Sequence, residues 1–299
     1  MFLVRLGLVL LLFLPFPARA NTNLFRLATF NIENYLEAPA GTRHAKSPAA
    51  QAKVRDCILA MRPDVIALEE MGATNALLDL QSNLAAKGLS LPFWDEITAN
   101  DTNIHLAVLS RFPIAARRPH TNENFVLDGR RVKVSRGFDE LDIQVNAHYT
   151  FTLIAAHLKS RRPSAVADEE EWRYEEAAAL RRVIDARCAA DPEQNLAVVG
   201  DFNDSPDSKP VRAIVGRGAA RLFDTHPAER NGDDEASRRV MWTHYYEKDD
   251  TYSRIDYILL GRGMRARWLQ DETYVLSTPD WGLASDHRPL AAGFSVPDP

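Results

Sequence analysis

The chain has 299 residues, of which 45% are hydrophobic and 9% aromatic, and this suffices for one large globular domain or two small ones. Its formal net charge of −5 excludes the overall basic character of a stable nucleic-acid binder. It does not exclude a nuclease, because bound divalent cations and a local basic patch can offset repulsion from phosphates. Cys57 and Cys188, the only cysteines, fall in expected helices and could be paired or be buried thiols.

Residues 1–20 have the pattern of a secretory signal. Arg5 supplies the positive start, residues 6–16 form an apolar run, and Ala18-Arg19-Ala20 has the small-x-small form of a cleavage site. An uncleaved membrane anchor is the alternative, but the apolar run is too short for a hydrocarbon core of about 30 Å. We therefore expect cleavage near Ala20. After cleavage, residues 21–299 would form a secreted or periplasmic catalytic domain without stable membrane association.

The apolar pattern predicts many short strands and a few helices. In chain order, the expected elements are a strand at 24–32, a helix at 49–61, a strand at 65–68, a helix at 76–86, strands at 105–109 and from 114, alternating strands within 132–145, a strand at 151–156, a helix at 165–190, and strands at 196–199, 255–260 and 290–294. The polar segment 229–239 is expected to be a mobile loop. Strands and helices do not alternate strictly, which favours an α/β sandwich over a barrel.

Polar residues end the first two expected strands. Asn31 ends the first strand, where an Asn is also typical of a simple turn. Glu69 and Glu70 close the second strand, and strand alternation places their side chains on opposite faces, so only one can face a shared site. A carboxylate on a rigid strand end can hold a hard cation such as Mg²⁺.

A histidine and a basic segment follow the strand at 151–156. His157 is either a structural histidine or a proton donor and phosphate contact. Lys159, Arg161 and Arg162 would then bind substrate phosphates, although a solvated basic loop explains them as well.

Acidic residues and a second histidine cluster in the last third of the sequence. Asp201 and Asn203 are two residues apart, so both can face one site, orient a water molecule and contact a phosphate oxygen. Asp286 precedes His287, whose imidazole is a natural general base near neutral pH. Asp256 could fix the tautomer of this histidine.

Several other chemistries lack their motifs. The chain has no P-loop, no dinucleotide fingerprint and no Gly-x-Ser-x-Gly nucleophile elbow, and its histidines and cysteines do not match zinc-site spacings. The remaining histidines receive no role, although His244 stands out because it precedes Asp256.

The ordered motifs resemble those of the endonuclease/exonuclease/phosphatase superfamily over nearly the whole chain after the leader. The matching segments are Thr29-Phe30-Asn31-Ile32, Leu68-Glu69-Glu70, Leu109-Ser110-Arg111-Phe112-Pro113, Ala156-His157-Leu158, Gly200-Asp201-Phe202-Asn203, Arg254-Ile255-Asp256-Tyr257 and Ser285-Asp286-His287. Each motif alone is weak, and their order carries the resemblance. The family usually has Gln where this chain has Glu69.

The resemblance implies a four-layered α/β/β/α sandwich, with two packed, mainly antiparallel sheets flanked by helices. It also implies a phosphoesterase that depends on Mg²⁺ or Mn²⁺. The implied roles are metal binding by Glu70, Asn31 and Asp286, a base with its orienting partner in His287 and Asp256, water positioning by Asp201, phosphate contact by Asn203, leaving-group protonation by His157, and substrate contact by Arg111.

These features predict an exported, divalent-metal-dependent phosphodiesterase, with nucleic acid as the favoured partner and endonuclease action on DNA or RNA. The basic segment at 159–162 and an expected hairpin that bears Arg130, Arg131, Lys133 and Arg136 motivate the nuclease, although solubility explains these cations nearly as well. The first alternative is an enzyme acting on a phospholipid or small phosphate ester. A sphingomyelinase-like enzyme should carry an exposed aromatic hairpin, whereas Trp94, Trp242 and Trp281 are scattered in the sequence. The second alternative is a non-catalytic binding module on the same scaffold.

Overall fold

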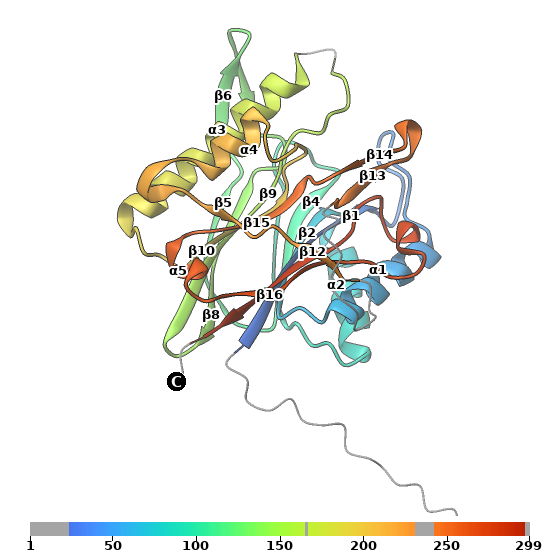
Figure 1. Cartoon of the computed structure of the whole chain (residues 1–299). Helices are drawn as coiled ribbons and strands as arrows, with labels where there is room; N and C mark the ends of the chain where they lie inside the picture. Colours follow the sequence, from blue (N-terminus) through green and yellow to red (C-terminus); the bar gives the residue numbers. More distant parts are fainter. Residues whose placement is uncertain (1–23, 165–166, 231–241, 297–299) are drawn as a thin grey trace, which may run out of the picture.

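The computed structural model describes residues 24–164, 167–230 and 242–296, and it shows two β-sheets packed face to face between helices (Figure 1). The seven-stranded sheet has the spatial order β12 (Ala228–Arg230), β16 (Trp268–Leu276), β17 (Leu290–Ser295), β1 (Leu24–Tyr35), β2 (Val65–Met71), β4 (His105–Ser110), β3 (Phe93–Ile97). The six-stranded sheet has the order β11 (Phe223–Asp224), β15 (Asp256–Leu260), β10 (Leu196–Asp201), β9 (Tyr149–His157), β8 (Phe138–Asn146), β5 (Ile114–His120). Two separate hairpins pair β6 (Asn124–Leu127) with β7 (Arg130–Lys133) and β13 (His244–Tyr246) with β14 (Thr251–Ser253).

Helices cover the outer face of each sheet (Figure 1). The seven-stranded sheet packs against α1 (Pro48–Met61) and α2 (Thr74–Ala86), and the six-stranded sheet against α3 (Glu169–Ala190) and α4 (Lys209–Val215). The short elements are α5 (Arg262–Arg265), η1 (Gly218–Ala220), η2 (Glu247–Asp249) and η3 (Trp281–Leu283). The third helix begins later than the sequence predicted, because Asp168 caps it by accepting a hydrogen bond from the Glu171 N–H.

Three apolar clusters hold the four layers together. Phe25 lies between the sheets, with its ring centroid 5.2 Å from those of both Phe151 and Phe294. Separate clusters join each sheet to its helices, through Ile58 on one side and Leu180 on the other. Both faces of each sheet are therefore buried, which explains the nearly continuous apolar runs of the central strands. The predicted four-layered α/β/β/α sandwich is confirmed.

Each sheet contains a parallel pair of strands that is joined by a helix, and the seven-stranded sheet has a second parallel pair in β12 and β16. β1 and β2 are parallel and connected through α1, and β9 and β10 are parallel and connected through α3. Parallel neighbours end at the same edge, so Asn31 lies opposite Glu69, and His157 opposite Asp201. β15 runs antiparallel to β10 and begins at this edge, where Asp256 lies opposite Asp201. This topology gathers polar residues from four strand ends and one strand start.

Two predictions lie wholly or partly outside the described residues. The leader at 1–20 is one, and the loop predicted at 229–239 is the other, except that Glu229 and Arg230 belong to β12. Within the described ranges, no helix is both long and apolar enough to cross a membrane. Cys57 in α1 and Cys188 in α3 are free thiols.

Candidate active site

Asp201 lies at the centre of the polar edge and is only 1% exposed. Its Oδ2 accepts hydrogen bonds from Asn31 Nδ2 at 3.0 Å and Asn203 Nδ2 at 3.2 Å, and its Oδ1 accepts one from the Asn203 N–H at 2.8 Å. Asn203 adopts a left-handed backbone conformation, with φ of 55°, which asparagine tolerates better than most residues. Burial raises the pKa of Asp201 to about 6, and the charge of His287 counteracts part of this shift.

The residue before Asp201 must be a glycine. Gly200 has φ of 133°, and a Cβ at this position would lie 1.9 Å from the Ala156 carbonyl oxygen. The parallel strands β9 and β10 thus approach closely just before the positions that carry His157 and Asp201.

His287 and Asp256 form the buried pair that the sequence predicted. The ring Nδ1 of His287 lies 2.9 Å from Asp256 Oδ2 and 3.2 Å from Oδ1. Its Nε2 points the other way, 3.7 Å from Asp201 Oδ2 and 3.9 Å from Asp286 Oδ1. Burial lowers the pKa of His287, but the charges of Asp256 and Asp201 outweigh burial and raise the pKa well above its ordinary value. Thr243 positions Asp256, because its Oγ1 accepts the Asp256 N–H at 3.1 Å.

His157 is the second buried histidine at this edge. Its Nε2 lies 3.5 Å from Asp201 Oδ2, and its buried Nδ1 makes no hydrogen bond within the described residues. Burial and the charge of Arg136 lower the pKa of His157 well below its ordinary value. The ring is therefore uncharged near neutral pH and can act there as a neutral hydrogen-bonding group.

Glu70 and Asp286 both lie near Glu33 and Lys46 at the rim of the site. Glu70 is the last residue but one of β2, with φ of 63°, and its Oε2 accepts the Asn34 N–H at 2.9 Å. Ser285 Oγ donates to the Asn31 carbonyl oxygen at 2.7 Å and ties the segment that carries Asp286 to β1. Burial raises the pKa of Glu33, and the charges of Asp286 and Glu70 raise it further. Both carboxylates therefore lie within electrostatic reach of Glu33.

Glu69, the neighbour of Glu70, faces the protein interior. It is fully buried, and Thr29 Oγ1 donates to its Oε1 at 2.6 Å. Burial raises the pKa of Glu69 well above its ordinary value. Glu70, in contrast, has a left-handed backbone at the irregularity of β2 between Glu69 and Met71, and it is only half-buried at the rim.

The rim carries oxygen atoms of the kind that a hard divalent cation binds. Glu33, Glu70 and Asp286 place three acids around Lys46, whose Nζ lies 3.7 Å from Glu33 Oε2. Asn31 adds an amide whose Oδ1 already accepts the Glu33 N–H at 3.0 Å. Mg²⁺ and Mn²⁺ prefer such oxygen ligands, and a divalent charge would balance the excess of acids.

The predicted phosphate-binding cations occupy different surroundings. Arg161 borders the site, since its Nε donates to the Asn203 carbonyl oxygen at 3.0 Å, and Arg162 is exposed on the same loop. Lys159 instead donates from Nζ to the carbonyl oxygens of Ser160 and Arg162, within its own loop.

Arg111 is not brought to the site. Its NH1 donates to Asp64 Oδ1 at 2.8 Å, at the beginning of β2, whereas Glu70 lies at the end of that strand. The reason is topological: β4 runs antiparallel to β2, so the residue after β4 lies at the opposite end of the sheet. The predicted substrate contact by Arg111 does not agree with this placement.

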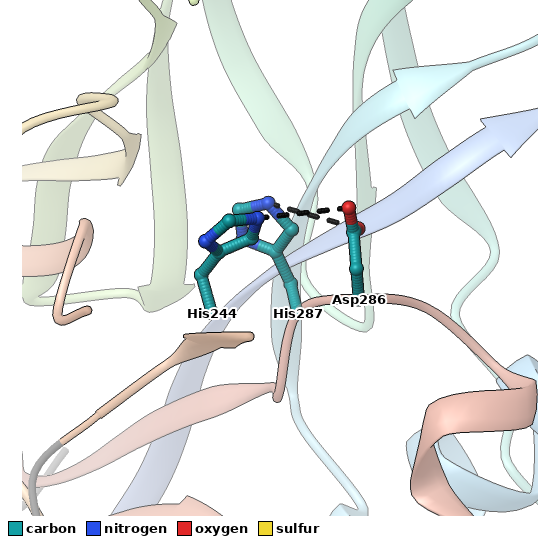
Figure 2. A group of neighbouring side chains, drawn as sticks. All are labelled: His244, Asp286 and His287. Atoms are coloured by element: carbon teal, nitrogen blue, oxygen red, sulfur yellow. Dashed lines mark ion pairs between the residues drawn. The ribbon is translucent and has the colours of Figure 1, made fainter. Parts of the chain in front are cut away.

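Aromatic residues that sequence analysis regarded as scattered meet next to the site. The ring centroid of Trp242 lies 5.2 Å from that of Trp281 and 4.9 Å from that of Tyr252, and Tyr245 stacks on Tyr252 at 4.7 Å. We call these four residues the aromatic cluster. It lies beside His244, which faces His287 and Asp286 (Figure 2). Trp242 and Trp281 are 39 positions apart, so only the fold reveals the cluster.

Buried acid–histidine pairs beside a carboxylate rim, on two packed sheets, are the groups that metal-assisted hydrolysis of phosphate esters needs. The model of the Endonuclease/Exonuclease/phosphatase family matches residues 28–287, and the chain belongs to this family. Its members are hydrolases acting on phosphoester bonds and generally depend on divalent metals. No curated protein sequence matches the chain.

Solved structures show the same fold at low sequence identity. The human Nocturnin catalytic domain is 17% identical with a TM-score of 0.63, over 92% of this chain and 95% of that chain. TDP2 from Caenorhabditis elegans is 15% identical with a TM-score of 0.60, over 91% and 98%. Sphingomyelinase C from Streptomyces griseocarneus is 15% identical with a TM-score of 0.59, over 91% and 99%. These similarities concern the fold and leave the substrate open.

Proposed function

We propose that the protein is an exported phosphodiesterase that depends on Mg²⁺ or Mn²⁺ and acts as an endonuclease on DNA or RNA. The observation that carries the proposal is the position of Asp201. It lies between the Nε2 atoms of His157 and His287, at 3.5 Å and 3.7 Å, beside the rim that holds Glu70 and Asp286. A water molecule and a phosphate oxygen could both be bound there.

Different residues of the site would bind the metal, accept the proton of the attacking water and contact the phosphate. Glu70 and Asp286, with Asn31, would hold the divalent cation, which supplies charge stabilisation to the phosphate oxygens when bound. The proton of the attacking water passes to the Asp201 carboxylate, which lies 3.7 Å from His287 Nε2, and Asp256 holds the imidazole through Nδ1. Asn203 Nδ2 and the neutral His157 ring are available as hydrogen-bonding partners of the substrate phosphate and the leaving oxygen.

Exposed cations support a nucleic-acid substrate. Arg130, Arg131 and Lys133 are exposed on the β6–β7 hairpin, and Arg161 lies at the edge of the site. Arg136 does not belong to this surface as the sequence suggested, because it is buried and donates to the Leu158 carbonyl oxygen. The aromatic cluster adds faces on which bases of a single strand could stack.

The aromatic cluster also favours the alternative substrate, a phospholipid. Its members Tyr252 and Trp281 lie near the exposed side chains of Tyr246 and Leu283, and such amphipathic rings suit a membrane interface. Trp242 and Trp281 are scattered in the sequence but meet in the fold, and this favours the sphingomyelinase-like alternative. A small phosphate ester would need neither the cations nor the rings.

A parallel assay tests the proposal. Mature protein is incubated with Mg²⁺ or Mn²⁺ and plasmid DNA, RNA or sphingomyelin, with excess EDTA as the metal-free arm. We expect cleavage of a nucleic acid, no activity in EDTA, and losses of several orders of magnitude for Glu70→Ala and His287→Ala. Hydrolysis of sphingomyelin alone would select the lipid alternative, and binding without hydrolysis would select the binding module. Mass spectrometry of protein recovered outside the cytoplasm tests export, with a new N-terminus near Asn21 as the expected result.

A further inference from the structure

His244 is held directly opposite His287 by main-chain hydrogen bonds. The Tyr245 N–H donates to the Asp286 carbonyl oxygen at 2.9 Å, and the Arg288 N–H donates to the Thr243 carbonyl oxygen at 2.7 Å. These two bonds lie on either side of His244 and His287, which face each other as a non-hydrogen-bonded antiparallel pair. In pairs of this type the side chains approach each other most closely. The two imidazole centroids are 4.6 Å apart. The backbone therefore preorganises both rings.

Both rings direct a nitrogen toward the same carboxylate (Figure 2). His244 Nε2 lies 3.6 Å from Asp286 Oδ2, and His287 Nε2 lies 3.9 Å from Asp286 Oδ1. The three donor atoms all lie within 4.8 Å of one another. Ligand atoms about 2 Å from a tetrahedral zinc ion are about 3.3 Å apart, so small side-chain rotations would bring these three into contact with one ion.

The orientation of His287 matches that of a metal-bound histidine. Its Nδ1 is hydrogen-bonded to the buried carboxylate of Asp256 at 2.9 Å, and this leaves Nε2 to face His244 and Asp286. A carboxylate behind a histidine in this way fixes the ring and increases its basicity as a ligand. This contact is independent of the cluster itself.

The ligand chemistry separates this cluster from the oxygen-rich rim at Glu70. Two imidazole nitrogens and one carboxylate suit Zn²⁺ or Co²⁺, whereas Mg²⁺ prefers oxygen ligands alone. We propose that His244, Asp286 and His287 form a second cation site, which shares Asp286 with the rim and is selective for a transition-metal ion such as Zn²⁺. Such an ion engages Nε2 of His287, the atom needed for hydrolysis, so micromolar Zn²⁺ inhibits the Mg²⁺-supported reaction. The binding site itself does not depend on the proposed function.

Cobalt and zinc binding test the site without an activity measurement. Mature protein is titrated with Co²⁺ and followed by its visible d–d absorption, and the zinc-loaded protein is measured by X-ray absorption. We expect one four- or five-coordinate Co²⁺ and two imidazole ligands on zinc. His244→Gln should weaken Co²⁺ binding about 10- to 100-fold or more. His226→Gln is the matched control, because His226 is exposed and pairs with Asp224 at 3.8 Å without a second imidazole.

The two cation positions should respond to opposite substitutions. Glu70→Gln should weaken Mg²⁺ binding and leave Co²⁺ binding unchanged, and His244→Gln should do the reverse. Unchanged Co²⁺ affinity in a folded His244→Gln protein would overturn the proposal, and so would a zinc spectrum with fewer than two imidazoles. The X-ray absorption measurement uses the unmodified protein, so it tests whether two imidazoles bind zinc even if the variant fails to fold. Failure to find a substrate would affect only the proposed function.

Discussion

Asn31 donates from Nδ2 to Asp201 Oδ2 at 3.0 Å, and this hydrogen bond connects β1 of one sheet to β10 of the other. Both residues are almost completely buried. Asn31 borders the metal-binding rim, and Asp201 contacts both buried histidines. The hydrogen bond therefore fixes the position of the rim relative to the histidines.

Removing this connection should impair catalysis more than stability. We expect Asn31→Ala to lower kcat about 100-fold or more, comparable to the loss of one preorganised hydrogen-bond donor in other active sites. Asn31→Asp should be worse, because it places a second carboxylate against Asp201. Initial rates and thermal unfolding check the result. Asn195→Ala is the control, since Asn195 donates to the Thr150 carbonyl oxygen at the far end of the sheet. Near-normal rates for Asn31→Ala would exclude this role.

Asp256→Asn should lower kcat by about 1,000- to 10,000-fold, because an amide in place of the carboxylate no longer secures the tautomer of His287. The side chain keeps its size, so the fold should be preserved. Steady-state kinetics measure the loss, and circular dichroism verifies the structure. Asp128→Asn, in the exposed turn of the β6–β7 hairpin, should match the unmodified protein. An equal loss in both variants would contradict a specific role for Asp256.

Glu69→Gln and Glu70→Gln should behave oppositely although the residues are adjacent. Glu69→Gln should retain activity because the side chain is buried against Thr29, whereas Glu70→Gln should lose activity and Mg²⁺ affinity. The raised pKa of Glu69 stabilises the fold below the ordinary value of 4.5, and this contribution is lost as pH rises through the folded-state pKa. Glu69→Gln should therefore gain stability relative to the unmodified protein as pH increases. Urea unfolding at pH 5 and pH 8 tests this, and an inactive Glu69→Gln would reverse the assignment.

Glu140 should contribute stability that disappears in acid. It is 1% exposed, and burial alone would raise its pKa, but hydrogen bonds from His120 and Arg118 outweigh burial and lower the pKa to about 2. A lowered pKa stabilises the fold above the ordinary value of 4.5, and the contribution is lost as pH falls toward 2. The shift corresponds to about 3 kcal/mol. Urea unfolding between pH 7 and pH 3 should show a shallower decline for Glu140→Gln, and parallel curves would rule this out.

Local patterns predicted the strand ends that build the site, but not the contacts made across long sequence separations. Asn31 lies in the last half of β1, Asp201 ends β10 and Asp256 begins β15. The hydrophobic period and the composition of such short segments can be recognised in the sequence. Arg111 was misplaced because a sequence does not state whether a strand runs parallel or antiparallel to its neighbour. His244 received no role because its partner His287 is 43 positions away and pairs with it through an isolated β-bridge at the start of β13.

The seam between the two sheets has a consequence for how activity emerges during refolding. Asn31 and Glu70 come from one sheet and His157 and Asp201 from the other, so neither sheet alone assembles a working centre. Enzymatic turnover should therefore return only with the final docking of the layers, after far-ultraviolet circular dichroism has already recovered. The rate at which enzymatic activity recovers should therefore measure the rate of the last folding step.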